Sequence, residues 1–170
     1  MLKSSTSSSL ITALHSDGPA RDRADRMGLY AFLVGDWTMD AVINQQDGGR
    51  ATGRGEIHAG WVLEGRAIQD VWILPNVFYG STLRIYDPER DAWHILWSDP
   101  LRQFYRRQLG RARGKDIVQD GEDEAGLPVR WSFTEITPDS FHWLGERVDA
   151  PGGPWWLQVE MFARRVRKSE

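Results

Sequence analysis

The sequence predicts an all-β fold, an antiparallel up-and-down barrel of about 8–10 strands preceded by a short helix. Apolar and polar residues alternate with a period of two over most of the chain beyond residue 34, which is typical of half-buried strands. Turn signals separate these segments roughly every 8–15 residues. Since the connections are short, neighbouring strands should form hairpins. A meander of this length normally closes into a barrel, because closure removes its exposed edges.

Composition restricts the class of protein. The chain has 170 residues, of which 41% are hydrophobic and 26% are charged, so we expect one soluble globular domain. The net charge of −3 argues against general affinity for nucleic acid, which needs a basic surface. The absence of cysteine excludes disulfides and thiolate zinc sites. No apolar run reaches the ~20 residues of a membrane helix, so we expect a cytoplasmic protein without membrane contact.

The first segments in chain order are a tail and a helix. Residues 1–19 are rich in serine, and we expect a disordered tail there. Residues 20–34 begin with charges and continue with apolar residues, which favours a short helix. We expect residues 20–170 to form a single barrel domain, because no repeat or linker-like stretch divides them.

About ten strands are expected after the helix. Turn signals bound them, for example QDGG at 46–49, DPER at 87–90 and APGGP at 150–154. The expected strands span residues 36–43, 51–63, 66–74, 80–87, 92–98, 103–113, 116–121, 128–136, 140–149 and 155–165.

The hairpin of strands 51–63 and 66–74 places a carboxylate on an apolar face. A two-residue turn at Glu64-Gly65 fixes its register. This register pairs Ile57 with Trp72, Ala59 with Asp70, Trp61 with Ile68 and Leu63 with Arg66. The face that holds these residues is the more apolar and aromatic one, so it should point into the barrel. Asp70 is therefore expected inside, with Arg66 near the rim.

Asp70 needs a partner there, because desolvating a lone carboxylate costs several kcal/mol. Arg66 is a poor candidate, since four residues along a strand span about 13 Å. Arg84 or Tyr86 is the better candidate, provided that strand 80–87 turns its even-numbered residues inward. Its odd-numbered face is also apolar. The sequence therefore leaves open which face points inward there, and in strands 92–98, 128–136 and 140–149.

Two classes of function fit these residues. The first is a pocket for a small, largely apolar molecule, aromatic or lipid-like, inside the barrel. Seven candidate ligand-binding residues are Trp61, Arg66, Trp72, Tyr86, Trp97, Trp131 and Trp143. In the alternative interpretation, no ligand pocket exists and the barrel is filled by its own side chains. The expected partner is thus a small apolar or aromatic ligand, without nucleic acid or membrane, and a homodimer is left open.

The second class is a cofactor-independent lyase, isomerase or cyclase. Asp70 with Arg84, or with a histidine such as His94, would be its catalytic acid–base group in an aromatic pocket. The four histidines show no HxH or HExxH spacing, so no metal and no cofactor are expected.

A basic run occupies residues 102–115 and includes Arg102, Arg106 and Lys115. Its two aromatic residues invite a reading as a single-stranded nucleic-acid site. A solvated strand is the simpler interpretation, given the negative net charge. In an intermediate interpretation, one or two of these arginines lie at the barrel mouth and favour a carboxylate-bearing ligand.

The segment FLVGDW at 32–37 resembles the Gly-x-Trp opening of lipocalin-like (calycin) barrels. The segments WVLEGRAIQDVW, YGSTLRIYDPERDAWHILWSD and FTEITPDSFHW are similar to a bacterial lipocalin-like family of unknown function, and the resemblance covers residues 28–165. It implies that Trp37 closes one barrel end and packs on Arg164 or Arg165 of the last strand. Haem-binding nitrobindins continue with Gly-x-Gly where this chain has TMD, so the resemblance does not extend to haem.

Overall fold

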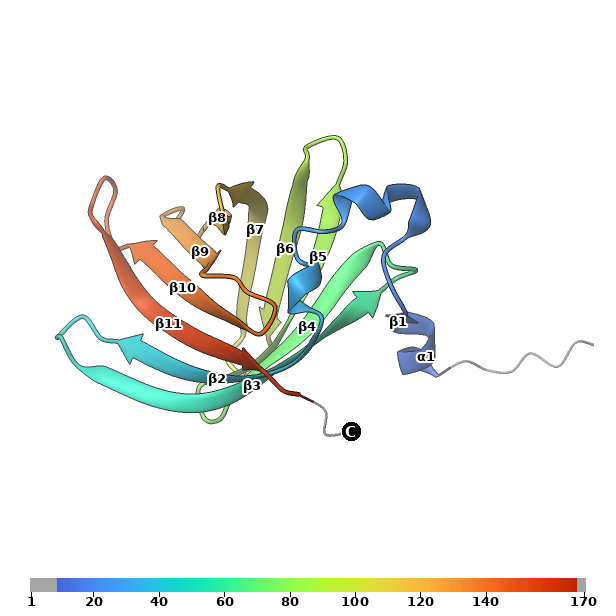
Figure 1. The fold of residues 1–170 in the computed structure, drawn as a ribbon. Helices are drawn as coiled ribbons and strands as arrows, with labels where there is room; N and C mark the ends of the chain where they lie inside the picture. The colour runs from blue at the N-terminus through green and yellow to red at the C-terminus, as the bar shows by residue number, and fades with distance from the viewer. Residues whose placement is uncertain (1–8, 168–170) are drawn as a thin grey trace, which may run out of the picture.

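A computed structural model describes residues 9–167 of the chain. Within this range, ten antiparallel strands form a closed barrel in which each strand pairs with the next and the last returns to the first (Figure 1). The barrel strands are β2 (Gly35–Asn44), β3 (Arg50–Val62), β4 (Ala67–Leu74), β5 (Phe78–Asp87), β6 (Ala92–Asp99), β7 (Phe104–Arg113), β8 (Asp116–Glu122), β9 (Pro128–Thr134), β10 (Ser140–Val148) and β11 (Trp155–Arg165). The predicted all-β, up-and-down barrel is thereby confirmed.

The segment before the barrel is helical only in short pieces. Two 3-10 helices, η1 (Arg21–Arg26) and η2 (Ala31–Leu33), replace the single helix expected over residues 20–34. Arg23 leaves helical geometry inside η1, so the hydrogen-bond ladder is not continuous. No helix within residues 9–167 is both long and apolar enough to cross a membrane.

The expected tail over residues 1–19 falls partly outside the described residues, which begin at residue 9. The described part forms α1 (Leu10–Leu14) and β1 (His15–Ser16). β1 pairs with the end of β3 at Trp61 and Val62, beyond the point where β2 begins. α1 has no buried residue, so this segment lies on the barrel without contributing to its core.

The β3–β4 register agrees with the sequence prediction. Ala59 lies opposite Asp70, Trp61 opposite Ile68 and Ile57 opposite Trp72. The turn is longer than expected, because residues 63–65 all have positive φ angles. The ladder therefore starts at Val62 and Ala67, and the expected pairing of Leu63 with Arg66 is wrong.

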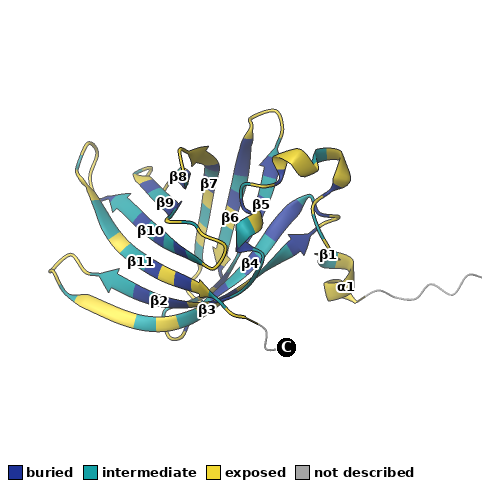
Figure 2. Cartoon of the chain, viewed as in Figure 1, coloured by how far each residue is buried: buried dark blue, intermediate teal, exposed yellow. Residues whose placement is uncertain are grey.

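Buried residues alternate with more exposed ones along many of the strands, as the dark blue bands between teal and yellow ones in Figure 2 show. On β5 the even-numbered residues are the buried ones, including Arg84 and Tyr86. This settles the face that the sequence left open. On β6, Trp93 and Ile95 are buried, while His94 belongs to the outer face.

One end of the barrel is closed by Trp37 and Arg165. Trp37 is fully buried, and its Nε1 donates to the carbonyl oxygen of Leu33 at 2.9 Å. The Arg165 guanidinium lies 4.1 Å from the centre of the Trp37 ring and donates to the carbonyl oxygens of Phe32 and Val34. A Cβ at Gly35 would lie 2.5 Å from the Arg165 Nη1. The arginine implied by the resemblance is thus Arg165, because Arg164 points outward to Asp40.

We predict that Trp37→Ala lowers the free energy of unfolding by about 3–5 kcal/mol, because it removes a large side chain from a packed core. Chemical denaturation followed by circular dichroism measures this loss. Trp155→Ala is the control, since Trp155 is partly exposed and should cost far less. Equal unfolding midpoints for Trp37→Ala and the unmodified chain would contradict the closure of the barrel by Trp37.

We also predict that deleting residues 1–19 leaves the thermal midpoint of unfolding unchanged, since α1 buries no residue and termini tied by few contacts contribute little. Differential scanning calorimetry compares this deletion with a shorter one that removes residues 1–8. A large loss confined to the longer deletion would show that the α1–β1 segment stabilises the barrel.

Candidate functional site

A cavity of about 460 Å³ opens at the barrel end opposite Trp37. Its wall comes from the inner faces of the strands and from the loops at 75–77 and 100–103. The residues that line it are Ile43, Trp72, Val77, Phe78, Thr82, Arg84, Trp97, Asp99, Arg102, Phe104, Trp131, Trp143, Gly145, Gln158, Val159 and Met161. The volume lies within the range of typical small-molecule sites.

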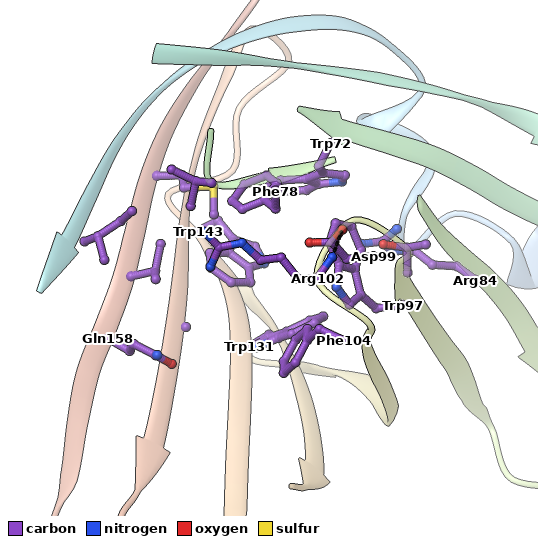
Figure 3. Close-up of a pocket in the computed structure, with 16 residues that line it drawn as sticks. Trp72, Phe78, Arg84, Trp97, Asp99, Arg102, Phe104, Trp131, Trp143 and Gln158 are labelled. Carbon is purple, nitrogen blue, oxygen red and sulfur yellow. Dashed lines mark hydrogen bonds between the residues drawn. The ribbon is translucent and has the colours of Figure 1, made fainter. Parts of the chain in front are cut away.

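Four tryptophans form a connected aromatic wall around the cavity. The ring centres of Trp97 and Trp131 are 6.2 Å apart, those of Trp131 and Trp143 are 5.5 Å apart, and those of Trp143 and Trp72 are 5.8 Å apart. Figure 3 shows Trp72 and Phe78 on one side of the space and Trp131 and Phe104 on the other. These rings offer flat apolar faces to a bound molecule.

Two glycines leave room for tryptophan rings to pack against the barrel wall. A Cβ at Gly145 would lie 2.9 Å from the ring of Trp143, and a Cβ at Gly80 would overlap the ring of Trp97. Each ring therefore lies flat over a backbone without a side chain. This packing leaves the centre of the barrel end unfilled.

The inner end of the cavity contains a buried ion pair between β4 and β5. Asp70 and Arg84 are only 1% and 2% exposed. The Arg84 Nη1 donates to Asp70 Oδ2, and the backbone N–H of Thr82 donates to Asp70 Oδ1 at 3.1 Å. Arg84 and Thr82 line the cavity, whereas Asp70 lies behind them. The sequence prediction that Asp70 is internal is confirmed, and of its two candidate partners, Arg84 and Tyr86, the structure selects Arg84.

The Arg84 guanidinium is buried among aromatic rings. Its guanidinium carbon lies 5.2 Å from the ring centre of Tyr30 and 5.7 Å from that of Phe133. Burial lowers the pKa of Arg84 to about 10, so the side chain stays cationic at neutral pH. Burial raises the pKa of Tyr30, which therefore remains a neutral hydroxyl that donates to Gln119 Oε1.

Two N–H groups of cavity residues lack an acceptor among the described residues. One is the Arg84 Nε–H, and the other is the Trp72 Nε1–H. Both side chains are more than nine-tenths buried. Buried polar groups in native proteins are nearly always paired, so these two mark a place where a ligand acceptor or a water would bind.

Asp99 and Arg102 form the polar part of the mouth. Asp99 is 1% exposed, and its Oδ1 accepts from the backbone N–H groups of Leu101 and Arg102. The exposed Arg102 donates to the carbonyl oxygen of Asn76 at 3.4 Å, which links the two mouth loops. Of the basic run 102–115, Arg102 lines the cavity, while Arg106 packs on Phe104 and reaches Glu124.

The structure brings five of the ten predicted site residues to the cavity. These are Trp72, Arg84, Trp97, Trp131 and Trp143. Asp70 contacts the cavity only through Arg84. Two of the three catalytic candidates, Asp70 and Arg84, therefore lie next to the aromatic wall.

The other four predicted site residues lie elsewhere. His94 is on the outer face of β6, where its Nε2 is 3.0 Å from Asp87 Oδ2, because residues next to inward-facing ones on a strand point outward. Arg66 lies outside the β3–β4 ladder and pairs with Asp22 at 3.0 Å. Tyr86 is near the closed end, where its hydroxyl donates to Asp91 at 2.8 Å. Trp61 packs in the core.

Several cavity residues could not be predicted from the sequence. Phe78, Asp99 and Phe104 lie at strand ends whose position relative to the mouth depends on the whole barrel. Asp99 followed by Pro100 is a turn signal, and this signal alone does not indicate a cavity. Among residues 9–167, no group of three or more His, Asp or Glu side chains is placed to hold a metal ion.

Comparison with solved structures identifies the architecture. The chain is similar to the S-type phycobiliprotein lyase CPES from Guillardia theta, with a TM-score of 0.62 and 12% identity over 86% of this chain and 98% of that one. It is also similar to Rv2717c from M. tuberculosis, with a TM-score of 0.55 and 11% identity over 85% and 99% of the two chains. No protein-family model and no curated protein sequence matches the chain. The lipocalin-like barrel is confirmed, and at these identities the likeness concerns the fold alone.

We predict that Asp70→Asn lowers the free energy of unfolding by about 3–5 kcal/mol, because it leaves the buried Arg84 cation without its counterion. Denaturant titration provides the measurement. Asp36→Asn is the matched control, since the Asp36–His58 pair is exposed and should contribute about 0–1 kcal/mol. A loss no larger than that of the control would contradict the burial of the ion pair.

Proposed function

We propose that the barrel binds a small, planar and largely apolar molecule in the cavity opposite Trp37. The observation that carries this proposal is the open space of about 460 Å³ bordered by four tryptophans. A barrel filled by its own side chains would leave no such space. Flat apolar walls with few polar groups favour an aromatic ligand that stacks on them. A lipid-like molecule is the other ligand that such walls accept.

The alternative function is acid–base catalysis by Asp70 without a cofactor. One structural neighbour is named a lyase, and a buried carboxylate beside an aromatic cavity is compatible with such chemistry. Against it, Asp70 lies behind Arg84 and Thr82, and each of its oxygens already accepts a hydrogen bond. A general base must reach the proton that it removes. The geometry therefore supports ligand binding over catalysis.

We predict that the neutral probe N-phenyl-1-naphthylamine binds in the cavity with an increase in its fluorescence. Trp131→Ala should weaken its binding about 5- to 10-fold, because it removes one stacking wall. Trp155→Ala is the matched control, since this partly exposed tryptophan is not a cavity residue. Equal affinities for both variants and the unmodified chain would place the probe elsewhere and contradict the proposal.

The same probe separates the two functions through Asp70→Asn, used at a temperature where the variant is folded. A binding protein should keep its probe affinity within a few-fold, because Asp70 does not line the cavity. An acid–base enzyme that depends on Asp70 should lose turnover by roughly 10²–10⁴-fold. Turnover that falls this far on a substrate of the protein would reverse our preference.

A further inference from the structure

We infer that the ligand of this cavity carries a neutral carbonyl oxygen, which accepts hydrogen bonds from the Arg84 Nε–H and the Trp72 Nε1–H. This inference rests on the proposed function and names the chemical class of its ligand: a planar aromatic ketone, amide or lactam. It follows from three properties of the cavity: its unpaired donors, its charge balance and the position of Arg84 at the inner end, away from the mouth.

The first property is the pair of unpaired donors. Arg84 and Trp72 both line the cavity, and they are only 2% and 5% exposed. Among the described residues, the Arg84 guanidinium hydrogen-bonds to Asp70 alone, through Nη1. Its Nε–H and the Trp72 Nε1–H find no acceptor within residues 9–167. Leaving buried donors unpaired costs free energy, so a ligand that supplies an acceptor is favoured over one that is a pure hydrocarbon.

The second property is the charge balance. Within residues 9–167, the charged residues that are buried as a whole are Asp70, Arg84 and Asp99. The Arg106 side chain is also largely covered, but it is paired with Glu124 and does not line the cavity. Asp70 already neutralises Arg84, and Asp99 adds a carboxylate at the cavity wall. A ligand carboxylate at Arg84 would bring a second anion to one guanidinium in a region of low dielectric constant. A neutral carbonyl satisfies the same donors without this repulsion.

The third property is the place of the donors. Arg84 belongs to the inner end of the cavity, whereas the exposed Arg102 belongs to the mouth. The ring system would then lie between the Trp72–Phe78 side and the Trp131–Phe104 side of the cavity (Figure 3), with the carbonyl group pointing inward. An anionic ligand held by Arg102 would instead keep its charged group at the mouth, in contact with solvent.

The test compares three probes of one shape on the full chain: 2-ethylnaphthalene, 2-acetylnaphthalene and 2-naphthoate. Affinities are measured by quenching of tryptophan fluorescence. Trp72→Phe replaces the indole by a smaller aromatic ring without an N–H, so it should weaken binding of the ketone about 3- to 10-fold more than binding of the hydrocarbon. The affinity for the hydrocarbon should fall only as far as the loss of stacking area requires. The naphthoate should bind at least about 10-fold more weakly than the ketone, because of the charge balance.

Trp131→Phe is the matched control, because it shortens another cavity tryptophan and should affect ketone and hydrocarbon alike. An independent readout is the infrared carbonyl stretch of bound 2-acetylnaphthalene labelled with carbon-13. Hydrogen bonding should shift this band to lower frequency than in hexane. The shift should be reduced in Trp72→Phe, with the remainder reporting on the Arg84 Nε–H.

The outcomes distinguish this inference from the proposed function. If the hydrocarbon and the ketone bind but Trp72→Phe weakens both equally, or the carbonyl band is unshifted, the neutral acceptor is wrong and the binding function stands. Tighter binding of 2-naphthoate than of the ketone would also overturn the inference, in favour of an anionic ligand. Failure of all three probes to bind would overturn both proposals.

Discussion

The buried ion pair between Asp70 and Arg84 divides the interior of this barrel. On one side of it, Trp37, Tyr30 and Phe133 pack in the hydrophobic core, while on the other side the cavity begins. A buried arginine needs a counterion, because its desolvation would otherwise cost several kcal/mol. Asp70 supplies the charge, and the neighbouring strand supplies a backbone N–H to the same carboxylate. The pair thereby forms the polar inner end of a largely apolar cavity.

The two ends of the barrel use aromatic residues in opposite ways. At the closed end, Arg165 covers Trp37 and bonds the carbonyl groups of the segment before β2, which seals the core. At the open end, Gly80 and Gly145 let Trp97 and Trp143 lie flat along the wall. The first arrangement fills space and stabilises the fold. The second leaves space, which a stable fold does not require and which a ligand can occupy.

Sequence patterns predict the barrel well because period-two alternation survives in nearly every strand. The β3–β4 register follows from one short hairpin, and it places Asp70 correctly. The inward face of β5 cannot be derived in this way, since Leu83 and Ile85 on its outer face are as apolar as an inner face would be. His94 remains a catalytic candidate from sequence alone, because the sequence does not show which face of β6 points into the barrel. The position of Asp99 depends on a loop at the mouth that no local pattern encodes, whereas the basic run around Arg102 already suggests arginines at the mouth without showing which one.

The central claim is that the four cavity tryptophans contact a bound planar molecule. Fluorine NMR of the protein labelled with 5-fluorotryptophan tests it directly during titration with 2-acetylnaphthalene. We predict that the resonances of Trp72, Trp97, Trp131 and Trp143, assigned by single Trp→Phe substitutions, shift together and saturate. Those of the closed-end Trp37 and the outer Trp155 should stay in place. Shifts confined to Trp155, or the absence of any saturable shift, would contradict the account.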